Sequence, residues 1–256
     1  MLCAAKTDDG ALFSGRCRLK FPLEVKAFLF LLGFLFAQAQ GAEKSVRVFI
    51  ALCDNKSQGI IPVGEKIGNG DNPDANLYWG CSESFGAYFK ASKEWRMAEN
   101  TAEVTEPVLR RMVLKSKEVQ MTAEAYRGSA IRKCIEDFER AAASGENDLV
   151  AFIGHNGLMD FSLPEPPAGR AGKTDAIVLC CMSDRYFRSR LEKMGCRPIL
   201  LTQQLMYPGS FLLHDALHIW LRAGSRSEIR AAAGQAYARN QKISIRAATG
   251  VFAALE

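Results

Sequence analysis

Two residues that together could act as a nucleophile and a base each follow a short apolar run. His155 ends the run in LVAFIGHNG, and Cys181 ends the run in AIVLCCMS. A cysteine attacks as its thiolate, and a nearby histidine usually takes the proton. The two side chains must come within hydrogen-bonding reach in a productive complex, which neighbouring strands that end together can arrange. The pair therefore suggests covalent catalysis by a thiol.

A second cysteine, Cys180, directly precedes Cys181. Adjacent residues on a strand point to opposite faces of the sheet, so only one of the two can face a site at the strand end. The residue further along lies just past the strand and is better exposed, which favours Cys181 as the nucleophile. A disulfide between these two cysteines, or from either to another cysteine, remains an alternative that would silence the nucleophile.

Alternating strand and helix patterns surround these residues. Short apolar runs predict strands over 46–53, 108–119, 148–154, 175–181 and 198–202. Helical spacing predicts helices over 77–91, 122–143, 186–194, 210–222 and 227–240, the first of them capped by Asn76 and the second ended by Ser144 and Gly145. This alternation is typical of a mostly parallel sheet covered on both faces, so we expect an α/β fold, a three-layer α/β/α sandwich.

In such a sheet, ligands bind beyond the carboxyl ends of the strands. The residues that follow the predicted strands are therefore the candidates for binding. Besides His155 and Cys181 they are Asp54, Asn55, Asn156, Gly157, Ser183, Thr202 and Gln203.

The two runs resemble the caspase–gingipain group of cysteine peptidases, in which one apolar strand ends in His-Gly and the next in Ala-Cys. The resemblance covers roughly residues 46–205, and it departs from the pattern where Asn156 separates His155 from its glycine and where Cys180 stands in place of alanine. It implies a caspase-like sandwich with Cys181 as nucleophile and His155 as base. The amide of Gly157 or Asn156 would join the Cys181 amide in an oxyanion site. The whole chain also resembles a group of secreted bacterial proteins whose activity is not established.

The function expected on these grounds is a secreted cysteine hydrolase, a peptidase acting on peptide or protein substrates. Asp54 at the end of the first strand could select a basic residue before the cleaved bond. The alternative is a non-catalytic secreted α/β protein that binds a small ligand or a peptide at the same strand ends.

Other groupings point less clearly to chemistry. His214 and His218 are spaced as in a zinc-binding helix, with Asp215 in the place of the usual glutamate, but the chain's one other histidine is His155. The loop over 68–74 is rich in oxygen-bearing side chains without the twelve-residue calcium pattern. A packed helix and a turn are the simpler interpretations, so we expect no metal and no cofactor.

The N-terminal segment has the features of an export signal. The run AFLFLLGFLF over 27–36 is too short to span a bilayer, basic residues precede it, and Ala37-Gln38-Ala39 follows it. We expect cleavage after Ala39, with Ala42 as a second possibility, and a true start as late as Val25. The alternative is a buried N-terminal helix. Residues 40–256 would then form a single secreted or periplasmic domain without a stable membrane anchor.

Composition fits a folded, soluble domain. Hydrophobic residues make up 48% and charged residues 24% of the 256 residues, close to average globular usage. The net charge of +5 is small, and the basic residues form no block, so nucleic acid is not an expected partner. Eight cysteines are too few for a disulfide scaffold.

Overall fold

A computed structural model describes residues 43–255 except 118 and 170–173. The predicted signal segment, residues 1–39, and its cleavage site lie outside these residues, so both stay predictions. Glu43–Glu256 form one compact unit. Within the described residues, no helix combines the length and apolar character that crossing a membrane requires.

Seven strands form one mixed sheet in the order β2-β3-β4-β1-β5-β6-β7. Their bounds are β1 Lys44–Ala51, β2 Arg96–Thr105, β3 Val108–Ser116, β4 Val119–Tyr126, β5 Leu149–Ile153, β6 Asp175–Leu179 and β7 Arg197–Leu200. Strands β4, β1, β5, β6 and β7 run parallel, and β2 and β3 continue the sheet as antiparallel neighbours of β4. The expected mostly parallel α/β sheet is confirmed, with an antiparallel edge that the sequence interpretation did not include.

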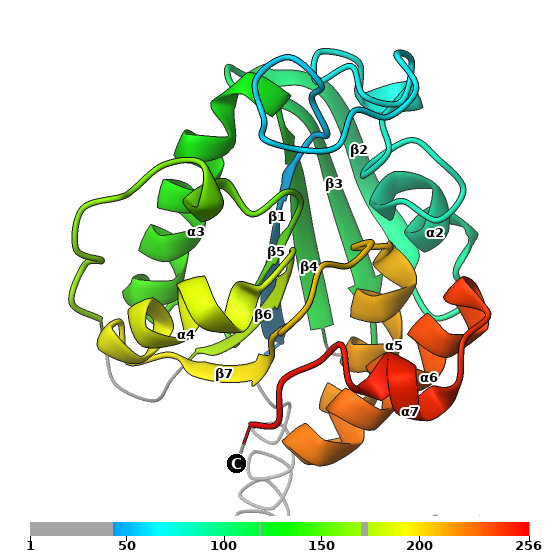
Figure 1. The fold of residues 1–256 in the computed structure, drawn as a ribbon, viewed down its shortest axis with the longest axis vertical. Coiled ribbons are helices and arrows are strands. Elements are labelled where there is room, and N and C mark those ends of the chain that lie inside the picture. The colour runs from blue at the N-terminus through cyan, green and yellow to red at the C-terminus, as the bar shows by residue number, and fades with distance from the viewer. Residues whose placement is uncertain (1–42, 118, 170–173, 256) are drawn as a thin grey trace, which may run out of the picture. The chain divides into compact units, whose positions relative to one another are not determined.

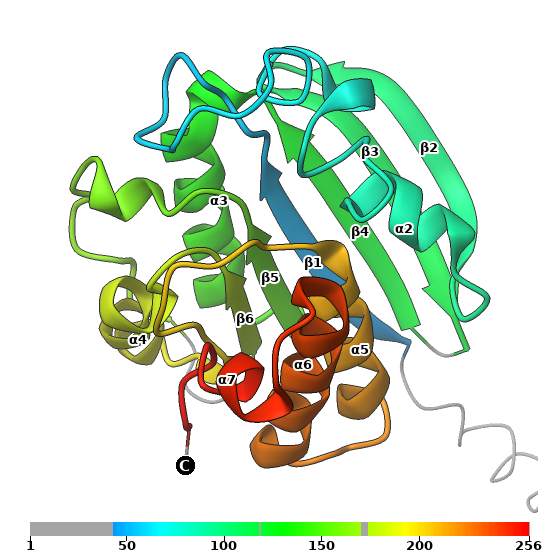
Figure 2. The same cartoon turned by 45° about the vertical axis from the view of Figure 1, so that its right-hand side comes forward.

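Two helical layers cover the sheet, as Figures 1 and 2 show. The helices are α2 Phe85–Ala91, α3 Ile131–Ser144, α4 Ser183–Lys193, α5 Ser210–Trp220, α6 Arg226–Gln241 and α7 Ile245–Thr249, with short 3-10 helices η1 Pro73–Ala75, η2 Gly128–Ala130 and η3 Gly157–Met159. Helices α3 and α4 pack on one face, and α2, α5 and α6 pack on the other. Alternation along β1 divides its side chains accordingly: Val48 and Ile50 face one core, Phe49 and Ala51 the other.

The prediction of a long helix over 122–143 was wrong in its first third. Residues up to Tyr126 belong to β4, where burial alternates over the first four positions, and the helix α3 begins only at Ile131. Its end was predicted correctly, since Gly145 takes the left-handed conformation (φ 67°) that favours glycine there. The strand expected over 108–119 is likewise divided between β3 and β4.

The helix predicted over 77–91 is also shorter than expected, because α2 begins at Phe85. The Asn76 side chain does not cap α2, whose N-cap residue is Ser84. The Asn76 side chain instead accepts from the Tyr78 and Cys53 amides, at 3.0 Å each, and donates to the Cys53 carbonyl at 2.8 Å. This buried side chain ties the long loop after β1 to the end of that strand.

Candidate active site

His155 and Cys181 leave the sheet side by side. In the parallel register of β5 and β6, Ile153 is paired with Leu179, and His155 and Cys181 each lie two positions further on. The fully buried Asn156 holds the two strand ends together, because its Nδ2 donates to the Cys181 carbonyl at 2.7 Å. The expectation that these two strands are neighbours and end together is therefore met.

A carboxylate that sequence reasoning missed orients the histidine. His155 is 7% exposed, and its Nε2 lies 2.8 Å from Oδ2 of Asp160, at the end of η3. The Gly59 amide also donates to this oxygen, at 2.9 Å. With the Asp160 carboxylate accepting from Nε2, Nδ1 is the nitrogen left to accept a proton.

The Cys181 thiol contacts a loop that the sequence interpretation did not single out. Its Sγ lies 3.4 Å from the Met206 amide and 3.6 Å from the Met206 carbonyl oxygen. In the described part of the chain, no hydrogen bond joins Sγ to His155. The two groups therefore share a strand-end region without a hydrogen bond between them.

Cys180 is separated from this region. It is fully buried in the core beneath α3 and α4, and its burial, with a smaller effect of Cys181, raises the pKa of its thiol well above the usual value. Such a thiol stays protonated and inert. Both residues are free thiols, as are Cys53, Cys81, Cys134 and Cys196.

Ser183 and Thr202 support the turn that follows Cys181. Both are fully buried; the Ser183 hydroxyl donates to the Val178 carbonyl, and the Thr202 hydroxyl accepts from the Ser183 amide at 3.1 Å. Met182 between strand and helix has φ 54°, a conformation that side chains rarely adopt. These hydrogen bonds hold that turn and place α4 directly behind Cys181.

The remaining predicted residues are engaged locally. The Asp54 carboxylate accepts from the Ser57 hydroxyl at 2.5 Å, the Asn55 side chain exchanges two hydrogen bonds with the Val63 backbone, and the Gln203 side chain donates to the Gly250 carbonyl. The Gly157 amide donates to the His155 carbonyl at 3.1 Å. Of the two amides proposed for the oxyanion site beside that of Cys181, the Gly157 amide is therefore already engaged.

Tyr78 and Cys53 lie next to the Cys181 side of this region. Burial, with a smaller effect of Asp54, raises the pKa of the Cys53 thiol to about 11, although a hydrogen bond with Tyr78 acts in the opposite direction. Burial also raises the pKa of Tyr78 well above the usual value, with smaller effects from the nearby Cys53 and Cys181. Both groups are therefore neutral at ordinary pH.

The spaced histidines of α5 lie elsewhere, against the segment before β2. His218 Nδ1 pairs with Glu94 at 2.8 Å, and His214 Nε2 lies 2.9 Å from the Ser92 hydroxyl. His214 also packs against the rings of Tyr88 and Phe89. Among the described residues, no group of three or more histidine, cysteine, aspartate or glutamate side chains is arranged to hold a metal ion.

Comparisons with protein-family models, with curated proteins and with solved structures found no match to this chain.

Proposed function

We propose that the protein is an exported cysteine hydrolase that cleaves peptide substrates, with Cys181 as nucleophile and His155 as base. The observation that carries the proposal is the register of β5 and β6, which brings both residues to one edge of the sheet, where Asn156 links them. The Asp160 carboxylate adds the third group of a thiol–imidazole–carboxylate arrangement.

The reaction follows from these roles. His155 Nδ1 takes the Cys181 thiol proton while Sγ bonds to the substrate carbonyl carbon. The carbonyl oxygen becomes negative and is stabilised by the Cys181 and Asn156 amides. His155 then gives its proton to the leaving amine as the carbon–nitrogen bond breaks. Water, deprotonated by His155, then attacks the carbon of the resulting thioester. The carbon–sulfur bond breaks to release the acid, and His155 returns the proton to Sγ. Asp160 holds the imidazole orientation and stabilises its positive charge.

One rearrangement is part of the proposal. Sγ now contacts the Met206 backbone, so a rotation about the Cys181 side chain, or a shift of the loop around Met206, must turn it toward His155. We expect substrate binding at the strand ends to trigger this change, because catalytic hydrogen bonds often form only in the enzyme–substrate complex.

Hydrolysis of a mixed fluorogenic peptide library under reducing conditions tests the proposal. Cys181→Ser and His155→Gln are expected to abolish turnover, while Cys180→Ser, at the neighbouring buried thiol, retains it. Turnover that survives Cys181→Ser, or an absence of turnover in the wild-type protein, contradicts the hydrolase assignment.

The second candidate is a non-catalytic protein that binds a peptide at the same strand ends. The observation that favours it is the Sγ contact with Met206 in place of His155. A peptide from the same library that binds with equal affinity to wild type and to Cys181→Ser, and is not cleaved, supports this candidate.

A further inference from the structure

Three large apolar side chains are exposed in the segments that follow parallel strands. Ile61 follows β1, Met159 follows β5 and Leu205 follows β7, with exposed fractions of 88%, 44% and 69%. Because β1, β5, β6 and β7 are parallel, these segments begin at the edge of the sheet that carries His155 and Cys181. A single exposed apolar side chain is common, but several around one site indicate a binding surface.

Leu205 is held next to the proposed nucleophile by its neighbours in the chain. The Gln204 carbonyl accepts from the Met182 amide at 3.0 Å, and the Met206 amide lies 3.4 Å from Cys181 Sγ. Figure 2 shows the gold segment between β7 and α5 passing across the ends of β5 and β6. The residues on both sides of Leu205 therefore contact the turn that carries Cys181, while the Leu205 side chain itself remains exposed.

Met159 and Ile61 lie on the His155 side of the same region. Met159 directly precedes Asp160, whose carboxylate lies 2.8 Å from His155 Nε2. Ile61 comes two residues after Gly59, whose amide donates to that same carboxylate at 2.9 Å. Exposed apolar side chains therefore flank both members of the proposed catalytic pair.

The two segments next to the pair offer little to a charged substrate side chain. Residues 201–209 contain no acidic or basic residue, and residues 154–163 contain no lysine or arginine and one acidic residue, Asp160, which is already engaged in the site. Asp54, which the sequence suggested as a partner for a basic residue, is buried and accepts from the Ser57 hydroxyl. Apolar contact is therefore what these segments provide.

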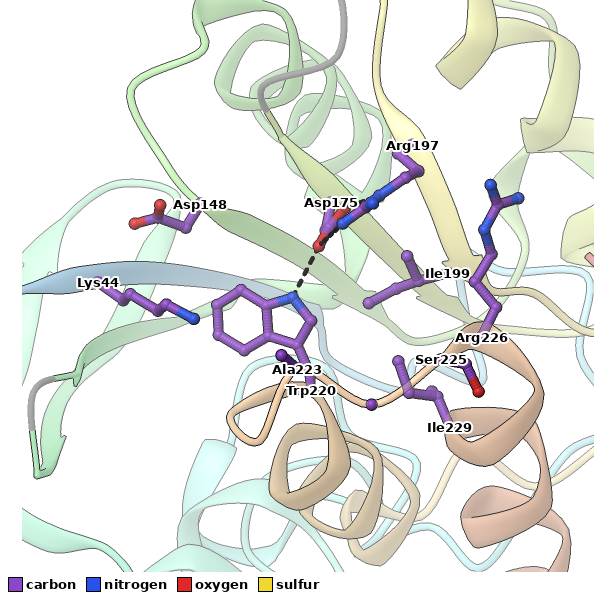
Figure 3. A pocket seen from close by; sticks show the side chains of 11 residues that line it. Lys44, Asp148, Asp175, Arg197, Ile199, Trp220, Ala223, Ser225, Arg226 and Ile229 are labelled. Atoms are coloured by element: carbon purple, nitrogen blue, oxygen red, sulfur yellow. Dashed lines mark hydrogen bonds and ion pairs between the residues drawn. The ribbon is translucent and has the colours of Figure 1, made fainter.

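The cavity drawn in Figure 3 does not provide a comparable apolar surface. It lies at the amino ends of the strands and has a volume of about 570 Å³. Its larger apolar side chains, Ile199, Trp220 and Ile229, are almost wholly buried. Its Asp175 is held by Arg197 and by the Trp220 indole. An apolar side chain of a ligand therefore finds more exposed partners at the carboxyl ends of the strands.

We propose that the site at the carboxyl ends takes peptides with apolar side chains on both sides of the cleaved bond. The inference rests on the proposed function, which sets the direction of the peptide. The acyl part of the substrate becomes bonded to Cys181, so the side chain before the bond packs on Leu205. The leaving amine takes its proton from His155, so the side chain after the bond packs on Met159 and Ile61.

Six-residue fluorogenic peptides test the inference, with alanine at every position except the two that flank the intended cleavage site. Each of these two positions carries leucine, aspartate or lysine in turn, and mass spectrometry locates the cut. At either position we expect leucine to exceed aspartate and lysine in kcat/KM by roughly tenfold or more. Leu205→Gln should lower the preference before the bond by roughly threefold or more, and Met159→Gln should do the same after the bond.

Two further variants serve as controls. Leu205→Met keeps an apolar side chain and should retain the preference before the bond. Met97→Gln is matched to Met159→Gln, because Met97 is also an exposed methionine but lies on the edge strand β2, four strands away from β5. It should leave both preferences unchanged.

Calorimetric titration of Cys181→Ser with the same peptides separates this inference from the hydrolase proposal. Tighter binding of the leucine peptides that is weakened by adding Leu205→Gln, without cleavage by the wild type, supports the apolar preference and refutes the hydrolase. Equal cleavage or binding of the leucine, aspartate and lysine peptides, a preference that neither Leu205→Gln nor Met159→Gln lowers, or an absence of both binding and cleavage overturns the inference.

Discussion

At the scale of single residues, the proposed chemistry depends on Asp160 as much as on the two residues that the sequence singled out. His155 and Cys181 could be predicted because each follows an apolar run that signals a strand. Asp160 and Met206 could not be predicted, because their contacts depend on the paths of irregular loops. Loop sequences show no helical or strand periodicity from which such a path could be inferred. The strand-end positions of Ser183 and Thr202 were also predictable, but not their burial in a supporting hydrogen-bond network.

Asp160→Asn keeps the size of the side chain and removes the charge that, in the proposed mechanism, orients His155 and stabilises its positive charge. Hydrolytic turnover is expected to fall by roughly tenfold or more. Steady-state kinetics on the best peptide from the library measures this effect. Asp74→Asn, at an exposed carboxylate paired with Arg110, is the control and should leave turnover unchanged. An equal loss of turnover in both variants would show that Asp160 has no specific role in the reaction.

Thiol alkylation separates the adjacent cysteines. In the native protein at pH 8, iodoacetamide is expected to modify Cys181, which is partly exposed, and to spare Cys180 and Cys134, whose burial raises their pKa well above the usual value. Peptide mapping after a short exposure gives the pattern. All three should react once the chain is unfolded, which serves as the control. Faster modification of Cys180 than of Cys181 in the native state would contradict the placement of Cys180 in the buried core and of Cys181 at the accessible strand end.

At the scale of elements, the parallel core was predictable and the antiparallel edge was not. Strands β1, β5, β6 and β7 read as short apolar runs because both of their faces are covered. Strand β2, RMAENTAEVT, has no such run, and its inclusion follows from pairing with β3. The second half of β4, residues 122–126, was predicted as helix because helical and strand patterns overlap where the alternation of buried and exposed residues is brief.

Glu124 connects three strands at the junction between the parallel and antiparallel parts of the sheet. It lies on β4, is 4% exposed, and pairs with Arg47 of β1 and Arg111 of β3, each at 2.7 Å. Glu124→Gln removes the charge from both pairs and should lower the free energy of unfolding by about 1–3 kcal/mol. Urea denaturation measures the change.

The matched control is Glu165→Gln, because Glu165 is an exposed glutamate in a single pair with Lys193. It should leave the urea midpoint unchanged, since surface ion pairs contribute little. An unchanged midpoint for Glu124→Gln as well would show that the Glu124 pairs do not stabilise the junction.

At the scale of the whole molecule, the fold keeps several thiol and phenol groups buried in their protonated form. Burial raises the pKa of Cys53 and Cys196 to about 11, from 9.0, and that of Tyr207 to about 12, from 10.0. The unfolded chain releases these protons at lower pH than the folded chain does, so the stabilisation they represent is complete below pH 9 and is lost as pH rises toward 12.

The free energy of unfolding is therefore expected to decline above pH 9, as followed by urea denaturation at a series of pH values. Cys53→Ala removes one of the three groups and should make the decline shallower. A stability that stays constant from pH 9 to pH 12, or an equal slope in Cys53→Ala, would show that these groups do not govern the alkaline limit.

In the proposed mechanism, the carboxyl ends of β5 and β6 place His155 where it activates the Cys181 thiol. The most direct measurement is labelling with a peptide acyloxymethyl ketone under reducing conditions, with the modified residue located by mass spectrometry. We expect one adduct, on Cys181, that forms in wild type and in Cys180→Ser and is lost in His155→Gln. An adduct on another cysteine, no adduct on Cys181, or labelling of Cys181 that is equally fast without His155 would contradict it.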